Sequence, residues 1–303
     1  MKKLIILLFF LVASLQASAQ EFIPLWQDNL PNSKGLHFTD SIENGRWRRV
    51  ANPGYFHFQP SKEENKGAAV VICPPGGYGH HTYDIAGFQL AKWFNTMGIH
   101  AFVLISRLPH SPDLTDRSTG PITDAQRMMQ IVRTLAPELD IAPDRIGIMG
   151  SSAGGHLAAT LATYETVLSY SNDRFDAAHC TPDFMILVSP VITMRDEYTH
   201  KGSVRNLLGE NPSQELRDRF SCEKHVRTDL TPPTFMAHAD NDPAVSSWNS
   251  WLFYEALKKA GIPSTLHIFP YGGHNIALRN NPGSTQQWTT LCEAWLYEMK
   301  IIE

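Results

Sequence analysis

The sequence predicts an α/β fold, in which a mostly parallel central sheet is covered by helices on both faces. Three observations predict it: short apolar runs of strand length recur along the chain, helical patterns separate them, and 43% of the 303 residues are hydrophobic. A continuous apolar run is typical of a strand that is buried on both faces. The composition is that of a globular protein able to bury a sizeable core.

The first 19 residues predict a signal peptide and not part of the fold. Lys2 and Lys3 precede an apolar run over residues 4–15, and Ala17-Ser18-Ala19 forms a small-x-small cleavage site. The run is shorter than the roughly 20 apolar residues that span a bilayer. The first cysteine after the cleavage site is Cys73, which leaves no position for a lipid anchor. We therefore expect a secreted or periplasmic protein with no stable membrane insertion.

The rest of the chain divides into a polar leader over residues 20–46 and one domain over residues 47–303. No linker, repeat or low-complexity segment interrupts that domain. The expected strands lie at residues 55–58, 67–73, 99–105, 145–149, 183–189, 233–238 and 264–269. The expected helices lie at residues 88–94, 123–135, 155–163, 246–260 and 285–299, with Thr123 as an N-cap. Residues 190–230 are charged, with short helical patterns, and predict a small insertion or cap.

Ser152 is the central residue of the one Gly-x-Ser-x-Gly pattern in the chain, Gly150 to Gly154. The strand at 145–149 precedes it and the helix at 155–163 follows it, which is the order that a nucleophile elbow requires. Glycines are needed in such a turn because larger side chains would collide with the neighbouring strand and helix. The alternative is a Gly-rich connection in which Ser152 only caps the following helix.

A serine hydroxyl needs a base, and the base needs an orienting carboxylate. Ligands of an open α/β sheet bind beyond the carboxyl ends of its strands, where these partners should lie in the order Ser, Asp or Glu, His. We favour His274, in a Gly-Gly turn after the last strand, over His267 within that strand. We favour Asp242, directly before a helix, over Asp240. The metal-binding alternative, with ligands His238, Asp240 and Asp242, does not account for Ser152 or the later histidine.

The tetrahedral intermediate of acyl transfer needs backbone N–H donors for its oxyanion. Ala153 directly follows the serine at a helix N-terminus, so its N–H is one candidate. The loop Pro74-Pro75-Gly76-Gly77-Tyr78 follows the strand at 67–73. Proline has no N–H, so Gly76 and Gly77 are the other candidates. A plain Gly-rich turn is the alternative.

Several other polar residues are candidates for contacts with a substrate. We expect Tyr78, the His80-His81 pair and the loop over residues 107–120 to shape the pocket. A metal site at His80, His81 and Asp84 is less favoured because adjacent residues on an irregular loop rarely converge on one ion. His156 lies one helical turn after Ser152 and is expected to make structural hydrogen bonds.

Composition and motifs limit the remaining partners. The net charge of −4 and the pI near 6.3 give no electrostatic case for nucleic acid as a partner. Neither a Gly-x-Gly-x-x-Gly nor a Walker-type loop occurs, so no cofactor and no metal is predicted. Four cysteines in a chain of this length do not form a disulfide framework. Cys73 ends an apolar run as a buried thiol would, but the pairing of Cys73, Cys180, Cys222 and Cys292 is left open. The oligomeric state is also open.

From about Gly67 to the C-terminus, the sequence resembles the secreted bacterial carbohydrate esterases of the α/β-hydrolase superfamily. This acetyl-xylan-esterase-like group is often labelled xylanase or lipase/esterase. The resemblance rests on the motifs Val70–Tyr78, Asp124–Arg127, Pro143–Gly147, Gly150–His156, Pro232–Phe235, Asp242–Val245 and Gly272–His274. It implies an esterase that removes short acyl groups, most often acetyl, from plant polysaccharides or oligosaccharides. It also implies the roles assigned above to Ser152, Asp242 and His274.

The sequence therefore predicts a secreted serine esterase of the α/β-hydrolase fold that acts on an acylated saccharide through an acyl-enzyme. Two alternatives stay open. One is a prolyl-oligopeptidase-type peptidase, which shares the fold and the order of the three residues. The other is a catalytically inactive hydrolase homologue that binds carbohydrate, against which the presence of all three residues argues.

Overall fold

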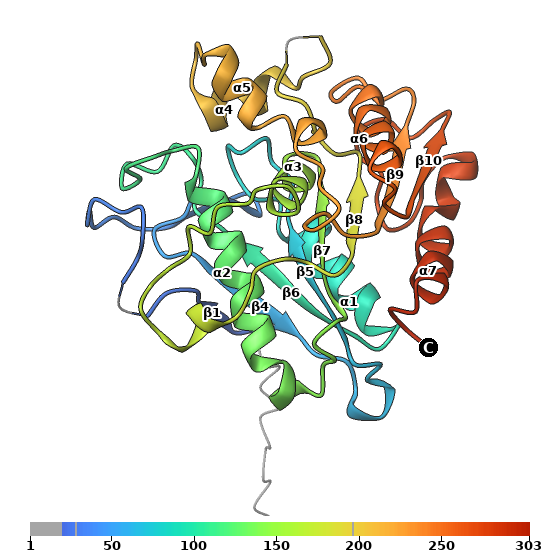
Figure 1. Cartoon of the computed structure of the whole chain (residues 1–303), viewed down its shortest axis with the longest axis horizontal. Helices are drawn as coiled ribbons and strands as arrows, with labels where there is room; N and C mark the ends of the chain where they lie inside the picture. The colour runs from blue at the N-terminus through green and yellow to red at the C-terminus, as the bar shows by residue number, and fades with distance from the viewer. Residues whose placement is uncertain (1–19, 28, 196) are drawn as a thin grey trace, which may run out of the picture.

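A computed structural model describes residues 20–27, 29–195 and 197–303. Its main sheet has eight described strands in the order β1-β4-β6-β5-β7-β8-β9-β10 (Figure 1). The strand pairs from β6 to β10 are all parallel. At the other edge, β4 is antiparallel to both of its neighbours, β1 and β6. The expected mostly parallel sheet is thus confirmed. Its strands are Phe22–Pro24 (β1), Gly54–Phe58 (β4), Ala68–Cys73 (β5), Ile99–Ile105 (β6), Ile146–Ser151 (β7), Met185–Val188 (β8), Thr234–Ala239 (β9) and Ser264–Phe269 (β10).

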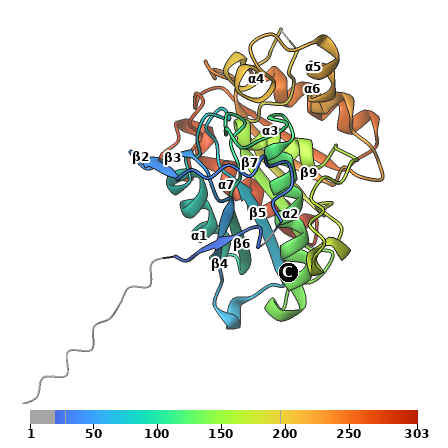
Figure 2. The same ribbon diagram turned by 90° about the vertical axis from the view of Figure 1, so that its left-hand side faces the viewer.

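The continuous apolar runs become the central strands because both of their faces are covered. Every residue of β5 and of β6 is buried. One core lies under α2 (Gly120–Leu135), α3 (Ala153–Leu161) and α6 (Trp248–Lys259), and includes Met128, Leu157 and Phe253. The other lies under α1 (Gln89–Asn95) and α7 (Trp288–Glu298), and includes Phe94 and Trp295. Figure 2 shows these two helical layers on opposite sides of the sheet.

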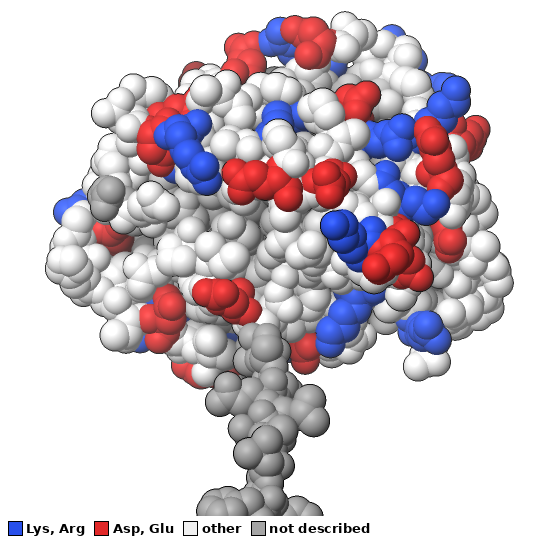
Figure 3. Space-filling model, turned by 90° about the horizontal axis from the view of Figure 1, so that it is seen from below, with Lys and Arg blue, Asp and Glu red and all other residues white. Residues whose placement is uncertain are grey.

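Residues 190–230 form the predicted cap. They contain two short helices, α4 (Lys201–Leu208) and α5 (Gln214–Arg219), which Figure 1 shows above the rest of the domain. The imidazole of His200 caps α4 by accepting a hydrogen bond from the N–H of Ser203. The face of the molecule away from this cap carries acidic and basic side chains side by side (Figure 3).

The expected leader over residues 20–46 differs from the observed structure. Its first residues supply β1, which pairs with β4 at the sheet edge. The boundary at residue 46 cuts a hairpin of β2 (Ser41–Glu43) and β3 (Arg46–Arg49). Backbone hydrogen bonds in both directions between Trp47 and His81, of 2.9 and 3.1 Å, fasten this hairpin to the loop after β5. The leader therefore packs as part of the domain, because its residues Leu25 and Trp26 are buried.

Two helix starts also differ. Helix α2 begins at Gly120, with Pro121 in its first turn, and Thr123 lies inside it. The Thr123 hydroxyl donates to the Thr119 carbonyl at 2.8 Å, so it does not cap the helix. Helix α7 begins at Trp288, after a 3₁₀ turn over Gly283–Gln287.

The predicted signal peptide, residues 1–19, lies outside the described residues. Within the part of the chain that the structure describes, none of the helices combines the length and apolar character needed to cross a membrane. The four cysteines are all unpaired, and Cys73, Cys222 and Cys292 are buried. Burial raises the pKa of each of these three thiols above its ordinary value, to about 12 for Cys222.

A buried ion pair joins the leader to the sheet and to α2. The Arg107 guanidinium donates to Asp124 at 2.8 Å, and both side chains are almost fully buried, at 1% and 0% exposure. Asp124 also accepts from the Trp26 indole at 2.9 Å and from the Arg107 backbone N–H at 2.7 Å. The carboxylate is thus fully hydrogen-bonded, which is the condition under which a buried charge is tolerated.

Replacing Asp124 with alanine is expected to lower the free energy of unfolding by about 3–5 kcal/mol, because it leaves Arg107 as an uncompensated buried charge. Urea denaturation at pH 7 measures this loss. Arg145→Gln is the control, because its pair with Glu303 is solvent-exposed, and we expect it to cost at most about 1 kcal/mol. A loss for Asp124→Ala no larger than that of the control would contradict the structural role of the pair.

Candidate active site

Ser152 lies in a sharp turn between the last residue of β7 and the first residue of α3. Its backbone has φ 53° and ψ −124°, a conformation that an L-residue adopts only under strain. The flanking glycines allow the turn because there is no room for side chains there. A Cβ on Gly150 would lie 2.1 Å from the Gly154 carbonyl oxygen, and one on Gly154 would lie 2.0 Å from that of Cys73. The lack of space at positions 150 and 154 thus explains why glycines flank the sharp turn that presents Ser152.

The structure brings Ser152, His274 and Asp242 into one hydrogen-bonded chain. His274 Nε2 lies 2.9 Å from Ser152 Oγ, and His274 Nδ1 lies 2.7 Å from Asp242 Oδ2. A carboxylate accepts, so Nδ1 carries the proton and Nε2 accepts from the serine hydroxyl. This is the tautomer that a general base acting on the serine requires.

Asp242 is held rigidly and in its charged form. Its side chain is fully buried, and Oδ1 accepts from the N–H groups of Ala244 and Val245 at 2.8 and 2.9 Å. Burial acts to raise the pKa of Asp242. Hydrogen bonds from His238, His274 and the Val245 N–H outweigh this effect and hold the pKa well below its usual range.

Sequence reasoning missed the contribution of His238, which lies in the buried part of β9. Its Nε2 lies 3.0 Å from the Val245 carbonyl and 3.3 Å from Asp242 Oδ2, so it donates toward both. Its Nδ1 accepts from the Ser250 hydroxyl at 2.8 Å. His238 thus supports Asp242 as a hydrogen-bond donor to Oδ2, the same oxygen that accepts from His274.

His267 and Asp240, the less favoured candidates for the base and the acid, lie outside this hydrogen-bonded chain. His267 stays within β10, where its ring is next to Thr265 and packs on Phe235. Asp240 is exposed and accepts from the Ser247 hydroxyl at 3.0 Å. Among the described residues, no group of three or more His, Cys, Asp or Glu is arranged to hold a metal ion, either around His238 or around His80 and His81.

Three backbone N–H groups near Ser152 are free to hold an oxyanion. Ala153 is the first residue of α3, and the first N–H groups of a helix have no partner within it. Gly76 and Gly77 have φ values of 150° and 60°, and in the described structure their N–H groups donate to no other group. The side-chain amide of Asn206, on α4 of the cap, donates to the Gly77 carbonyl at 2.8 Å. The cap therefore fixes the orientation of this loop.

An open pocket of about 900 Å³ lies over Ser152 and His274. Much of its wall comes from three segments. They are the loop after β5 that contains Gly76 and Gly77 (the oxyanion loop), the cap, and the loop after His274. The apolar part of that wall includes Ile85, Leu90, Ile276, Leu278 and Trp288. The polar part includes Arg46, Arg48, His80, Thr82, His200 and Asn206. Of these polar residues, only His80 was predicted, because the others come from the hairpin, from the cap or from later in the loop.

The predictions that Tyr78 and His81 contact the substrate are wrong, because both side chains point into the core. The Tyr78 hydroxyl lies 2.7 Å from Nδ1 of His156, and His156 Nε2 donates to the Phe220 carbonyl at 2.8 Å. His81 Nε2 donates to the Ser106 carbonyl at 2.7 Å. Burial raises the pKa of Tyr78 and lowers the pKa of both His81 and His156 to about 4, so these groups are neutral structural partners.

The loop over residues 107–120 also contributes nothing to the pocket lining. Arg107 is bound to Asp124, and Asp113 accepts hydrogen bonds from Ser33 and from the backbone of Lys34 and Leu36. The loop thus anchors the N-terminal segment instead of facing the substrate.

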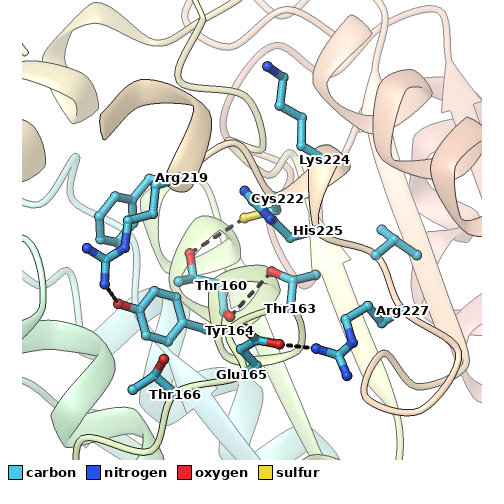
Figure 4. A pocket seen from close by; sticks show the side chains of 12 residues that line it. Thr160, Thr163, Tyr164, Glu165, Thr166, Arg219, Cys222, Lys224, His225 and Arg227 are labelled. Atoms are coloured by element: carbon cyan, nitrogen blue, oxygen red, sulfur yellow. Dashed lines mark hydrogen bonds and ion pairs between the residues drawn. The ribbon is translucent and has the colours of Figure 1, made fainter. Parts of the chain in front are cut away.

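A second cleft, of about 300 Å³, lies beyond the C-terminal end of α3 (Figure 4). Its charged groups are paired: Arg219 with the Tyr164 hydroxyl, and Arg227 with Glu165. The buried thiol of Cys222 lies 3.5 Å from the Thr160 hydroxyl, and burial raises its pKa to about 12. A thiol with that pKa is protonated at neutral pH and is no nucleophile, so this cleft lacks the chemistry found at Ser152.

The chain is similar to several known proteins. Residues 121–299 match the prolyl oligopeptidase family. The chain is 36% identical over 217 residues to an acetylxylan esterase of Xylanibacter ruminicola, and 34% identical over 233 residues to endo-1,4-beta-xylanase B of Butyrivibrio fibrisolvens. These matches cover 70% and 75% of this chain, but only 42% and 34% of those longer relatives.

Solved structures extend the comparison over the whole domain. An acetyl ester-xyloside bifunctional hydrolase from Caldicellulosiruptor lactoaceticus has a TM-score of 0.79 and is 34% identical, covering 94% of this chain and 98% of its own. A carboxylesterase from Lactobacillus plantarum has a TM-score of 0.67 at 20% identity, covering 88% of this chain and 99% of its own, and shows the shared fold.

Proposed function

The chain belongs to the prolyl oligopeptidase family and, within it, to the acetyl-xylan-esterase-like α/β-hydrolases, and on this premise we propose that it hydrolyses acetyl esters on xylan or xylo-oligosaccharides. The observation that carries the proposal is the contact between Ser152 Oγ and His274 Nε2 at 2.9 Å, with Asp242 behind it. The names of the similar acetylxylan esterase and acetyl ester-xyloside hydrolase support the substrate class.

The reaction follows from the positions of these groups. Ser152 Oγ attacks the ester carbonyl carbon while His274 Nε2 takes its proton, and Asp242 stabilises the imidazolium that forms. The N–H groups of Gly76, Gly77 and Ala153 hold the oxyanion. His274 then gives its proton to the departing sugar oxygen, which leaves an acetyl group on Ser152. Water, deprotonated by His274, then attacks the acetyl carbon. The bond to Ser152 Oγ breaks, acetate leaves, and His274 returns the proton to the serine oxygen.

A peptidase activity is the second candidate, because the matching family takes its name from prolyl oligopeptidases. It uses the same three residues but must expel an amine in place of an alcohol.

A xyloside is a further substrate to test. The similar Caldicellulosiruptor enzyme is described as a bifunctional hydrolase of an acetyl ester and a xyloside.

Acetate release from a panel of acetylated xylo-oligosaccharides tests the proposal. We expect acetate from these substrates and no cleavage of a proline-containing amide. The proposal fails if only the amide is cleaved. It also fails in its acyl specificity if longer acyl or feruloyl esters are hydrolysed and acetyl esters are not.

Asn206→Ala is expected to lower kcat about tenfold and to change KM much less, because the Gly77 carbonyl loses its anchor and the oxyanion donors lose their alignment. Initial rates on an acetyl ester measure this split. Arg205→Ala is the control, because Arg205 directly precedes Asn206 on α4, is exposed and lies outside the pocket lining. Equal kcat values for the two variants would remove Asn206 from its positioning role.

Export of the protein remains part of the proposal. The basic and apolar pattern of residues 1–19 supports it. The mass of the N-terminal peptide from the natural host tests it, with a mature chain beginning near Gln20 as the expected result. An intact Met1 on the mature protein would contradict export through this segment.

A further inference from the structure

Two arginines form one wall of the pocket over Ser152. Arg46 and Arg48 are two residues apart on β3, and side chains at that spacing lie on the same face of a strand. Trp47 lies between them on the other face, where it is 5% exposed and packs against Phe22, Phe56 and Tyr83. Since Trp47 also makes both backbone bonds to His81, the hairpin is fixed with its arginine face toward the pocket.

This wall is positively charged, and Arg46, one of its two arginines, has no acidic partner among the described residues. In the described structure, no acidic side chain lines the pocket. The Arg46 side chain has no hydrogen bond or ion pair with any described residue. Arg48 Nε forms a partly exposed ion pair with Glu43 at 3.5 Å, and this nitrogen has no hydrogen-bond partner. Two guanidinium groups therefore face a cavity that offers them no anion.

The arginine wall lies on the side of the oxyanion loop. His80 lies beside Gly76, because a Cβ on Gly76 would approach the His80 backbone and ring to within 3.0 Å. Burial, followed by the charges of Arg46 and Arg48, lowers the pKa of His80, which places both arginines near that imidazole. An acetyl group fills only a small part of about 900 Å³, so a group that reaches the arginines belongs to the larger alcohol part of the ester.

We propose that Arg46 and Arg48 form an anion subsite that binds the carboxylate of a uronic acid residue on the acetylated saccharide. The proposal rests on the function proposed above and names its substrate class more closely. The guanidinium fork matches the planar carboxylate and can donate two parallel hydrogen bonds to it. Binding at this subsite is non-covalent and leaves the chemistry at Ser152 unchanged.

Three substrates separate the possible positions of the carboxylate. They are a neutral acetylated xylo-oligosaccharide, the same oligosaccharide bearing a uronic acid, and a neutral oligosaccharide carrying a succinyl ester. We expect kcat/KM at low salt to favour the uronic acid substrate over the neutral one by about tenfold, and 0.5 M salt to reduce this ratio to about twofold by screening. A preference for the succinyl ester alone, lost in the arginine variants, would place the carboxylate on the acyl side and overturn the assignment.

Arg46→Gln and Arg48→Gln are each expected to lower the uronic-to-neutral ratio about threefold, and the double variant to bring it near one. Arg205→Gln is the matched control, with the same loss of charge on an exposed residue outside the pocket. No preference in the wild type, or a preference that survives in the double variant, overturns the subsite while leaving the esterase intact.

Calorimetric binding to Ser152→Ala tests the subsite without turnover. A de-esterified uronic acid oligosaccharide is expected to bind about tenfold more tightly than its neutral counterpart, and this difference should vanish in the background of both arginine changes. Equal affinities would overturn the subsite. If no substrate, including p-nitrophenyl acetate, yields acetate with the wild type, the proposed function fails, and the binding result still decides the subsite.

Discussion

Replacing Ser152 with alanine is expected to lower kcat toward an acetyl ester by a factor on the order of 10⁶, which is the scale seen when the nucleophile of a serine hydrolase is removed. The cause is local: the hydroxyl that His274 deprotonates is absent, so no acyl-enzyme can form. Since Ser152 lies in a strained turn, the same change is not expected to destabilise the fold. Hydrolysis of p-nitrophenyl acetate, with thermal unfolding of the same sample, measures both effects.

His274→Ala provides the control for this result. The two residues act as a unit, so the double variant should be no slower than either single variant within a few-fold. Multiplicative losses would mean that Ser152 and His274 act independently. Replacement of the adjacent Ser151, which also lines the pocket, should leave most of the activity in place. A Ser152→Ala enzyme that retains its rate would contradict the assigned nucleophile.

Asp242→Asn has the second largest expected effect, a fall in kcat on the order of 10⁴. Asparagine fits the same space, but it can offer its NH₂ group to His274 Nδ1, which favours the tautomer with the proton on Nε2. That tautomer cannot accept the proton of Ser152. Asp240→Asn is the matched control, because Asp240 is exposed and contacts Ser247 and not His274, so its rate should change less than a few-fold. Equal losses would contradict the choice of Asp242.

The same carboxylate also predicts a pH dependence of stability. Its folded pKa lies below the unfolded value of about 3.9, so its stabilising contribution is present above that value and is lost as the pH falls toward the folded pKa. The wild type should therefore lose stability between about pH 5 and pH 2 more steeply than Asp242→Asn. Urea unfolding at each pH measures this difference. If the free energies of unfolding of the two proteins fall equally steeply across this range, the result contradicts the depressed pKa.

Much of the site could be predicted because its chemistry follows from local patterns at strand ends. The glycines around Ser152 are needed for steric reasons, and the five-residue pattern from Gly150 to Gly154 indicates this need directly. The positions of Asp242 and His274 follow from the chain order of strands whose apolar runs are continuous. The cap could be located because residues 190–230 lack those runs, although its hydrogen bond from Asn206 to Gly77 could not be foreseen.

The errors arose where side-chain direction depends on irregular backbone or on distant pairing. Gly77 and Tyr78 both have φ near 60°, so no periodicity indicates that Tyr78 turns inward while His80 faces the pocket. The pocket-lining role of Arg46 and Arg48 depends on the pairing of Trp47 with His81, residues that are far apart in the sequence. The sequence around Trp47 gives no local signal for such a contact.

Labelling with a fluorophosphonate tests the central claim most directly, because this probe forms a bond only with a serine that is activated as a nucleophile. Peptide mass spectrometry of the labelled wild type is expected to show one adduct per chain, on Ser152, and intact-protein mass is expected to show none in Ser152→Ala or His274→Ala. An adduct on Ser151 or elsewhere, or an unlabelled wild type that still hydrolyses acetyl esters, would contradict the claim that Ser152 is the nucleophile.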